Sequence, residues 1–151
     1  MDAVEALGKL GDPDAIDAVT ARLNDPAEHE LVRQQAAQVL GQLVRGEVFA
    51  PLVSVLDDPS VDVRCQALYA LAESAGPAAV ELLLARTTDP NTYVRHAAVT
   101  ALGRVGNESL IPLLERIAQH DQGELGRAMW VREAARYAIE GIRKRHLIQP
   151  T

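Results

Sequence analysis

The sequence is poor in the residues from which several kinds of site are built. Only one of its 151 residues is a cysteine, Cys65, which excludes an internal disulfide and a metal site made of several cysteines. Aromatic residues make up 3% of the chain while alanine and leucine abound, so the core has to be built from small and aliphatic side chains. That composition is typical of stacked helices and not of the aromatic, β-branched strands of a sandwich.

Positive charge and long apolar segments are also scarce. Fifteen basic residues stand against 21 acidic ones, which gives a net charge of −6, whereas a duplex-binding domain usually has a basic face. We therefore expect no nucleic-acid partner. No apolar run approaches the roughly 18 residues that cross a membrane, and the first residues lack the basic and apolar regions of a signal peptide. We expect a soluble, cytoplasmic protein with no membrane partner.

The chain does contain an internal repeat. A Val-Arg dipeptide recurs at intervals of 31, 31 and 37 residues, and an alanine follows each arginine by three residues. An Asp-Pro dipeptide precedes three of the four copies, and a further apolar segment precedes every copy. The dipeptides are Val32-Arg33, Val63-Arg64, Val94-Arg95 and Val131-Arg132; the turns are Asp25-Pro26, Asp58-Pro59 and Asp89-Pro90; the apolar segments are 15–23, 49–56, 78–84 and 110–117.

Apolar residues within each copy recur at helical spacing and form one stripe about 100° wide, which predicts an amphipathic helix with one buried face. Each unit is therefore predicted to be two helices joined by a turn. One pair cannot bury its own apolar faces, so the pairs have to stack. We predict an all-α, right-handed superhelix of about four helix pairs. It forms a single array over residues 1–151, with a partial unit at 1–10 and repeats at about 12–45, 46–75, 76–106 and 107–146.

This pattern resembles the HEAT repeats, and more closely their short variety in phycobilisome lyase subunits. The third copy carries the resemblance in its Asp89-Pro90 turn, the following Val94-Arg95 with Ala98, and then Ala101-Leu102-Gly103. The resemblance implies that the second helix of each pair lines a concave surface on which partners commonly bind. It is specific for the fold and not for the function, because such repeats serve many unrelated partners.

Two kinds of enzyme have similar repeats. Deoxyhypusine hydroxylase places His-Glu directly after the arginine to bind two irons, whereas the corresponding pairs here lack it, and glutamine is a poor iron ligand. These pairs are Gln34-Gln35, Cys65-Gln66, His96-Ala97 and Glu133-Ala134. We expect no such chemistry, no metal and no cofactor. A bilin lyase-like or other chromophore-handling subunit stays an alternative, because no repeat motif separates a lyase from a scaffold, and we favour a non-catalytic protein without excluding an enzyme.

The candidate site follows from helical angles. Positions one, five and nine after each arginine point away from the buried stripe and form polar columns with two tyrosines, a residue enriched at binding hot spots. We hypothesise that a peptide or protein binds there; a solvated face that binds nothing and a small-molecule site are the alternatives. The columns contain Gln34, Gln38, Gln42, Cys65, Tyr69, Glu73, His96, Thr100, Arg104, Glu133, Tyr137 and Gly141, and all but Gln42, Cys65 and Gly141 are taken as candidate contacts.

The fourth unit has six additional residues between its helices, in a segment with Gly123, Gly126 and the only tryptophan, Trp130. Insertions into repeats often create binding loops, so this segment is a candidate loop; equally, Trp130 packs over the end of the array. Glycines at Gly11, Gly76 and Gly106 are expected to end helices in left-handed turns.

The repeated arginines and aspartates are expected to be structural. A residue that recurs once per unit beside a turn most simply bonds the aspartate or free carbonyls of that turn. The first ten residues begin in mid-repeat without a Val-Arg dipeptide. Either the chain belongs to a longer solenoid, or its N-terminal edge meets a second copy. A fragment or an engineered repeat protein without a ligand of its own is a further alternative to the scaffold.

Overall fold

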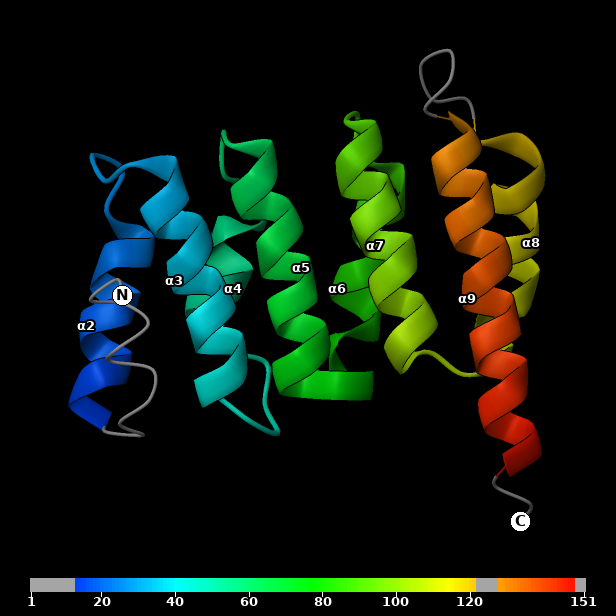
Figure 1. Ribbon diagram of the computed structural model, residues 1–151, viewed down its shortest axis with the longest axis horizontal. Coiled ribbons are helices and arrows are strands. Elements are labelled where there is room, and N and C mark those ends of the chain that lie inside the picture. The colour runs from blue at the N-terminus through cyan, green and yellow to red at the C-terminus, as the bar shows by residue number, and fades with distance from the viewer. Residues whose placement is uncertain (1–12, 122–127, 149–151) are drawn as a thin grey trace. The chain divides into compact units, whose positions relative to one another are not determined.

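The computed structural model of the chain describes residues 13–121 and 128–148, and every regular element in these ranges is helical (Figure 1). The chain divides into two compact units, Met1–Ala79 and Val80–Thr151, which are described in turn. The all-α fold class predicted from the repeat is confirmed. The partial unit predicted at residues 1–10 lies outside the described residues.

The first unit alternates short and long helices. Helix α3 packs against α2 and against α5, and α4 with its 3-10 extension η1 packs against α5. The side chains between them include the fully buried Val19, Leu23, Leu40, Leu52 and Leu71. The elements are α2 (Pro13–Asn24), α3 (Glu30–Leu43), α4 (Ala50–Ser54), η1 (Val55–Asp57), α5 (Val61–Ala75) and η2 (Gly76–Ala79).

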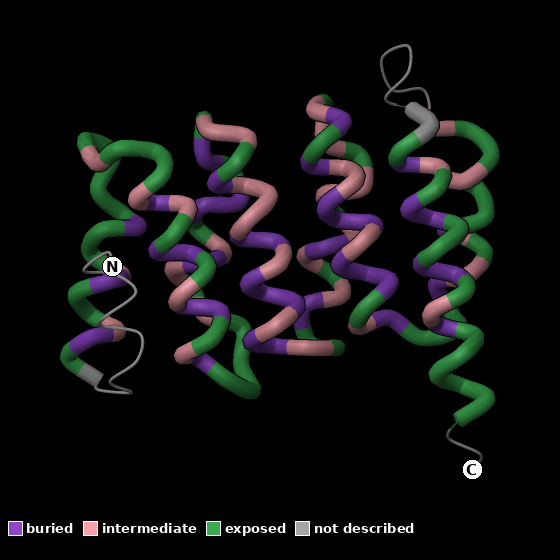
Figure 2. Tube along the Cα trace, viewed as in Figure 1, coloured by how far each residue is buried: buried purple, intermediate pink, exposed green. Residues whose placement is uncertain are grey.

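The second unit repeats this arrangement. Helix α7 packs against α6 and against α9, and α8 packs against α9. In each unit the Val-Arg dipeptides lie in the longer helices, and Figure 2 shows that buried positions recur along these helices at helical spacing. The elements are α6 (Val80–Ala85), η3 (Arg86–Thr88), α7 (Thr92–Val105), η4 (Glu108–Leu110), α8 (Ile111–His120) and α9 (Ala128–Ile148).

The three Asp-Pro turns share one geometry. In each, the aspartate Oδ1 accepts a hydrogen bond from the amide two residues later: Ala27 to Asp25 at 2.9 Å, Ser60 to Asp58 at 2.8 Å, and Asn91 to Asp89 at 2.8 Å. The proline between them needs no partner because it has no N–H. The aspartates are turn formers, as predicted.

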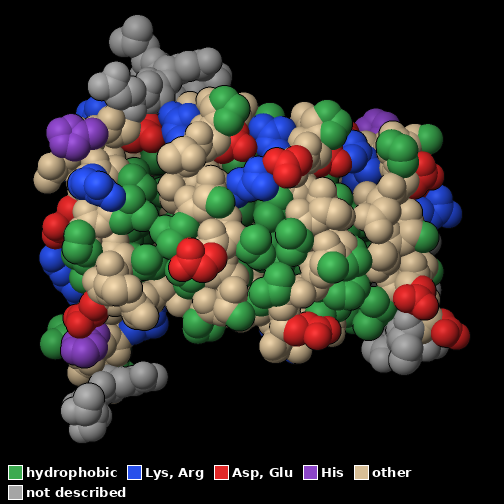
Figure 3. Space-filling view, turned by 180° about the vertical axis from the view of Figure 1, so that it is seen from behind, with side chains coloured by type: hydrophobic (Ala, Val, Ile, Leu, Met, Phe, Trp, Pro, Cys, Tyr) green, Lys and Arg blue, Asp and Glu red, His purple; other side chains and the backbone are tan. Residues whose placement is uncertain are grey.

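The repeated arginines form hydrogen bonds and ion pairs with these turns, which confirms their structural role. Arg33 donates to the carboxylate of Asp58 in the next copy, and Arg95 donates to both carboxylate oxygens of Asp121 at 2.9 and 3.1 Å. Arg64 and Arg95 also donate to carbonyls of their own turns, at 2.7 Å to Asp58 O and 3.0 Å to Asp89 O. Figure 3 shows basic and acidic side chains side by side along the turn edge of each unit.

Asp121 is the turn aspartate of the fourth copy, which the sequence did not single out because no proline follows it. Its carboxylate accepts from Arg95, and its carbonyl accepts from Arg132 at 3.0 and 2.8 Å. The side chains of Arg95 and Asp121 are 13% and 8% exposed, so this pair is nearly as buried as Arg33 and Asp58 at 11% and 5%.

One of the predicted glycine turns is confirmed and one is wrong. Gly76 follows α5 with φ of 55°, in the left-handed region that favours glycine. Gly106 has φ of −75° instead. A Cβ there would lie 2.5 Å from Cδ1 of Leu110 and 2.6 Å from the carbonyl oxygen of Leu102, so crowding and not backbone angle calls for glycine. Gly46, with φ of 84°, is a left-handed turn that the sequence analysis missed, and Gly11 lies outside the described residues.

One stretch among the described residues, Val61–Thr88, is long and apolar enough by composition to cross a membrane. Half of the residues in its most apolar 18-residue segment are buried inside the protein, which is typical of a core helix. The left-handed turn at Gly76 also interrupts it, so the stretch does not form one straight helix. It is weak evidence for a membrane span.

Candidate functional site

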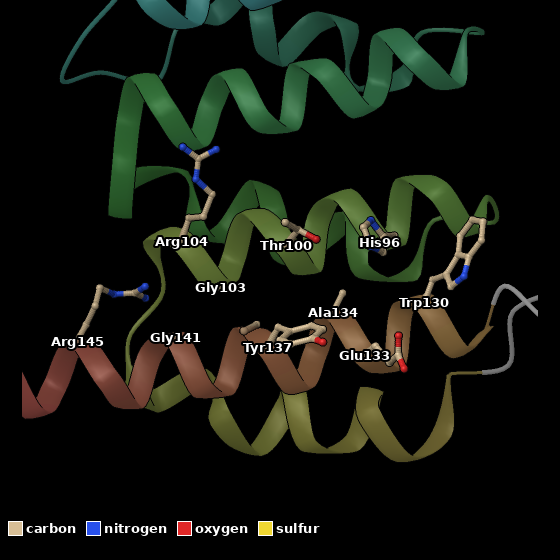
Figure 4. A pocket seen from close by; sticks show the side chains of 11 residues that line it. His96, Thr100, Gly103, Arg104, Trp130, Glu133, Ala134, Tyr137, Gly141 and Arg145 are labelled. Atoms are coloured by element: carbon tan, nitrogen blue, oxygen red, sulfur yellow. The ribbon is translucent and has the colours of Figure 1, made fainter.

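A groove of about 540 Å³ runs between α7 and α9 in the second unit (Figure 4). The predicted polar columns supply much of its lining, because residues four apart lie on the same face of a helix. Five of the nine candidate contacts meet there, together with Gly141 and Trp130. The five are His96, Thr100, Arg104, Glu133 and Tyr137.

The floor of the groove consists of small residues: Gly103 from α7 and Ala134 and Ala138 from α9. A Cβ on Gly103 would lie 2.7 Å from Cβ of Ala138 and 2.8 Å from its Cα. The absence of a side chain at Gly103 therefore lets the two helices approach closely. The volume between the larger residues of the rim stays open because the floor side chains do not fill it.

The two large aromatic residues of the groove are exposed. Tyr137 is 73% exposed and Trp130 is 47% exposed. The Trp130 ring lies against Tyr93, with centroids 6.1 Å apart and planes tilted by 52°, so one side of the indole is covered and part of it remains accessible. Trp130 belongs to the first turns of α9 and not to a loop, which corrects its assignment to the inserted segment. Gly123 and Gly126 lie outside the described residues.

The two ends of the groove differ in charge. Arg104 and Arg145 lie at the end formed by the C-terminal parts of the two helices, whereas Glu133 lies at the other end beside Trp130 (Figure 4). Arg145 donates to the carbonyl oxygen of Gly106 at 2.9 Å. Within the described residues, Glu133 and Arg104 form no ion pair with another side chain.

The imidazole of His96 lies at the Glu133 end of the groove and is half-buried. Burial removes water from the charged form, so the pKa of His96 is lowered from its ordinary value of 6.5. The neutral imidazole therefore predominates at pH 7. A neutral ring offers one hydrogen-bond donor and one acceptor and does not repel a cation.

The other four candidate contacts lie in the first unit. Gln34 and Gln38 are on α3, and Tyr69 and Glu73 are on α5. Gln38 is exposed, whereas Gln34, Tyr69 and Glu73 are half-buried. Glu73 accepts a hydrogen bond of 3.4 Å from Arg45 of the same unit. The nine candidates thus form two sets, one in each unit.

Sequence reasoning missed Arg145 and the small residues of the floor. Arg145 lies four residues after Gly141, so it continues the outward column by one more turn, and extending the column would have found it. Gly103 was noted only in the Ala-Leu-Gly segment that carries the resemblance, Ala138 belongs to a column assigned to packing, and Ala134 was not assigned to the buried stripe or to an outward column. They contribute to the groove because their small side chains leave space between the helices. A list of outward-facing positions does not identify such residues.

Among residues 13–121 and 128–148, no three His, Cys, Asp or Glu side chains lie close enough together to hold a metal ion. The groove contains one carboxylate and one imidazole. What it offers chemically is aromatic contact area, hydrogen bonding at the rim, and opposite charge at its two ends.

Comparison with known proteins assigns the repeats. A family model described as HEAT repeats matches residues 1–41 and 49–140. The chain belongs to the HEAT repeat family. This confirms the resemblance inferred from the Asp-Pro turns and the Val-Arg segments.

Curated relatives with HEAT-like similarity differ in what they are named for. The chain is 28% identical to an uncharacterized phycocyanin operon protein Z of Pseudanabaena tenuis over 148 residues, 93% of this chain and 70% of the relative. It is 39% identical to deoxyhypusine hydroxylase of Arabidopsis thaliana over 64 residues, 42% of this chain and 20% of that protein. The hydroxylase of Schizosaccharomyces pombe is 26% identical over 119 residues, 79% of this chain and 28% of its own.

The chain thus spans a fifth and about a quarter of the two hydroxylases and a larger share of the phycocyanin operon protein. Repeats of this kind occur in an enzyme and in a protein named for its operon. The similarity accounts for the helical repeat architecture, and the function has to be argued from the groove.

Proposed function

We propose that this HEAT repeat protein is a non-catalytic interaction domain that binds a peptide, or an extended segment of a partner protein, in the groove between α7 and α9. The groove's exposed aromatic residues carry the proposal. The chain has one tryptophan, three tyrosines and one phenylalanine. Trp130 and Tyr137 line this one groove, and the ring of Tyr93 contacts that of Trp130.

Exposed aromatic side chains have a physical meaning in a chain that has so few of them. Tryptophan and tyrosine supply large contact area at small cost in conformational entropy, and they dominate the energetics of many interfaces. Both lie on α9, so above the floor of glycine and alanine they form one wall of a slot whose other wall is α7. A side chain from a partner would fill that slot and release water from both aromatic faces.

The shape of the groove favours an elongated partner. Its volume of about 540 Å³ is within the range of ordinary ligand pockets. It is elongated along the helices, however, because its lining on α9 extends from Trp130 to Arg145, which is 15 residues or about 22 Å. An extended segment of several residues matches such a slot better than a compact small molecule does.

Trp130 gives a direct test because it is the only tryptophan of the chain. Peptides selected from a random displayed library against the purified protein should shift its emission to shorter wavelength as they cover the indole. Replacing Tyr137 by alanine should weaken these peptides about tenfold or more. Leu147→Ala removes a comparable exposed side chain of α9 outside the groove and should leave affinity unchanged. Peptides that bind both variants alike would refute the proposal.

Chromophore handling is a second candidate. It is favoured by the similarity to the phycocyanin operon protein over 93% of this chain. The face of Trp130 and the ring of Tyr137 could stack on a flat conjugated molecule. Incubation with a linear tetrapyrrole should then change the pigment's absorption spectrum, and the change should be lost in Trp130→Ala. An unchanged spectrum would leave peptide binding as the function.

A further inference from the structure

We infer that the groove between α7 and α9 selects segments that carry a basic residue and an acidic residue roughly four to six positions apart, with an apolar side chain between them. The inference rests on the proposed function and defines the chemistry of the partner. The groove carries opposite charges at its two ends, and the distance between them sets the spacing.

The end near the start of α9 is suited to a basic side chain. Glu133 is exposed and has no ion pair within the described residues, so its charge is available to a partner. Trp130 precedes it by three residues and lies on the same side of the helix, as Figure 4 shows. A lysine or arginine can therefore lie on the indole face while it pairs with the carboxylate. The neighbouring His96 is half-buried and uncharged at neutral pH, and offers no repulsion.

The opposite end is suited to a carboxylate. Arg104 from α7 and Arg145 from α9 bring two guanidinium groups to this end, and the groove lining there contains no acidic side chain. Arg145 uses one N–H for the carbonyl of Gly106, which holds its guanidinium at the rim and leaves its other donors for a partner. A guanidinium group binds a carboxylate strongly, so the two arginines at this end favour an acidic side chain of the partner.

The middle of the groove provides the apolar contact. Tyr137 lies between the charged ends, with Thr100 on the facing helix (Figure 4). Beneath them the small residues Gly103 and Ala138 leave room for one side chain of the bound segment. An aliphatic or aromatic residue between the two charges of the partner would fill this space.

The spacing follows from helix geometry. Glu133 occupies the first position after its arginine and Arg104 occupies the ninth, so the two differ by eight residues of helix, or about 12 Å along the groove. Arg145 is 12 residues beyond Glu133, or about 18 Å. An extended peptide advances about 3.3 Å per residue, which places the two charges of the partner roughly four to six residues apart.

The test uses four blocked peptides with the same apolar centre and different ends: one basic and one acidic, both basic, both acidic, and both neutral. Emission from Trp130 measures their affinities at low and high salt. The peptide with opposite ends should bind most tightly, and each mismatched end should weaken it about two- to fivefold, with the difference reduced by salt.

Charge-reversal variants identify which end of the groove binds the basic residue of the peptide and which binds the acidic one. Glu133→Lys should weaken the peptide with opposite ends and tighten the one with two acidic ends. Arg104→Glu combined with Arg145→Glu should also weaken the peptide with opposite ends, and should tighten binding of the peptide with two basic ends. Glu140→Lys and Arg116→Glu alter exposed charges of the same kinds outside this groove and should not change the order of affinities.

The outcomes separate this inference from the function on which it rests. If the peptides bind, and Tyr137→Ala weakens all four, but their order ignores the charged ends and the variants, the groove binds peptides without reading charge and the inference is wrong. If none of the four, nor any selected library peptide, responds to Tyr137→Ala, peptide binding in the groove is itself refuted. A changed order with the charge variants supports both.

Discussion

The helix pairs α3/α5 and α7/α9 are built alike and present different surfaces. In each pair a glycine of the first helix meets an alanine of the second: Gly41 meets Ala70, and Gly103 meets Ala138. A Cβ placed on either glycine would lie 2.7 Å from the Cβ of that alanine. In α3/α5 the outward column includes a half-buried Tyr69 and a Glu73 that pairs with Arg45. In α7/α9 the equivalent tyrosine, Tyr137, is 73% exposed.

The difference shows that, within one repeat, the residues that pack the helices together and the residues that can bind a partner occupy different positions of the helix. The columns that recur exactly, such as the glycine and alanine contacts and the arginine and aspartate turns, hold the helices together in both units. The columns that vary decide what the surface can bind. The exposure of a residue at a given position also depends on the neighbouring helices. Tyr69 and Tyr137 both lie five positions after their arginines, yet Tyr69 is half-buried and Tyr137 is exposed.

The largest effects are expected at the buried ion pairs of the turns. Asp58→Ala in the first unit and Asp121→Ala in the second each leave a nearly buried guanidinium without its carboxylate. Each should lower the free energy of unfolding by about 3–5 kcal/mol in urea titrations. Asp25→Ala removes the same kind of turn bond at an exposed position and should cost about 1 kcal/mol. Losses at Asp58 or Asp121 no larger than that at Asp25 would contradict a common fastening role.

The next effects concern the close approach of the helices. Gly41→Ala and Gly103→Ala each place a Cβ against the backbone of the partner helix, and should destabilise by about 1–2 kcal/mol after the gain in helix propensity. Gly141→Ala is the matched control, because its nearest neighbours are 3.8 Å away. It should stabilise the protein by about 0.5–1 kcal/mol. Thermal unfolding of the three variants checks the sign, and stabilisation at Gly103 would contradict the packing described for the groove floor.

The two tyrosines should separate stability from binding. Tyr69→Ala removes a half-buried ring and should cost about 1–2 kcal/mol of stability, whereas Tyr137→Ala should cost less than about 0.5 kcal/mol. Peptide affinity should respond in the opposite order. Chemical denaturation and fluorescence titration of the same two variants make the comparison. Equal loss of stability in both would mean that Tyr137 is structural and does not belong to a binding surface.

Part of the fold could be predicted from the sequence alone. The helices, the turn aspartates and the arginine contacts follow from recurrence, because what recurs in every copy must satisfy the same packing each time. Recurrence fails where one copy deviates. Asp121 lacks the proline that marks the other turns. Gly106 is required by crowding from Leu102 and Leu110, four residues away on either side, which approach it only because of the way the chain turns after α7.

The site was predicted only in part for a related reason. Helical angles identified the polar columns, and five of the nine candidates do line one groove. The angles could not show that Trp130 lies in the first turn of a helix and that its ring contacts Tyr93. They also could not show that Tyr69 is less exposed than Tyr137, because burial depends on neighbouring helices and not on position within one.

The smallest expected effect is a pH dependence at the groove. Burial lowers the pKa of His96, so between its folded value and the ordinary value of 6.5 the unfolded chain binds more protons than the folded one. His96 therefore favours folding least in acid: stability is full above pH 6.5, falls as the pH drops through that window, and levels off below the folded pKa. His96→Gln should abolish this part of the slope while the carboxylates contribute equally to both proteins. Denaturant unfolding between pH 4.5 and 7.5, at steps of half a unit, measures the difference between the two curves. Parallel curves over the whole range would mean that the His96 imidazole is solvated, and that the groove wall at the Glu133 end is more open than the structure shows.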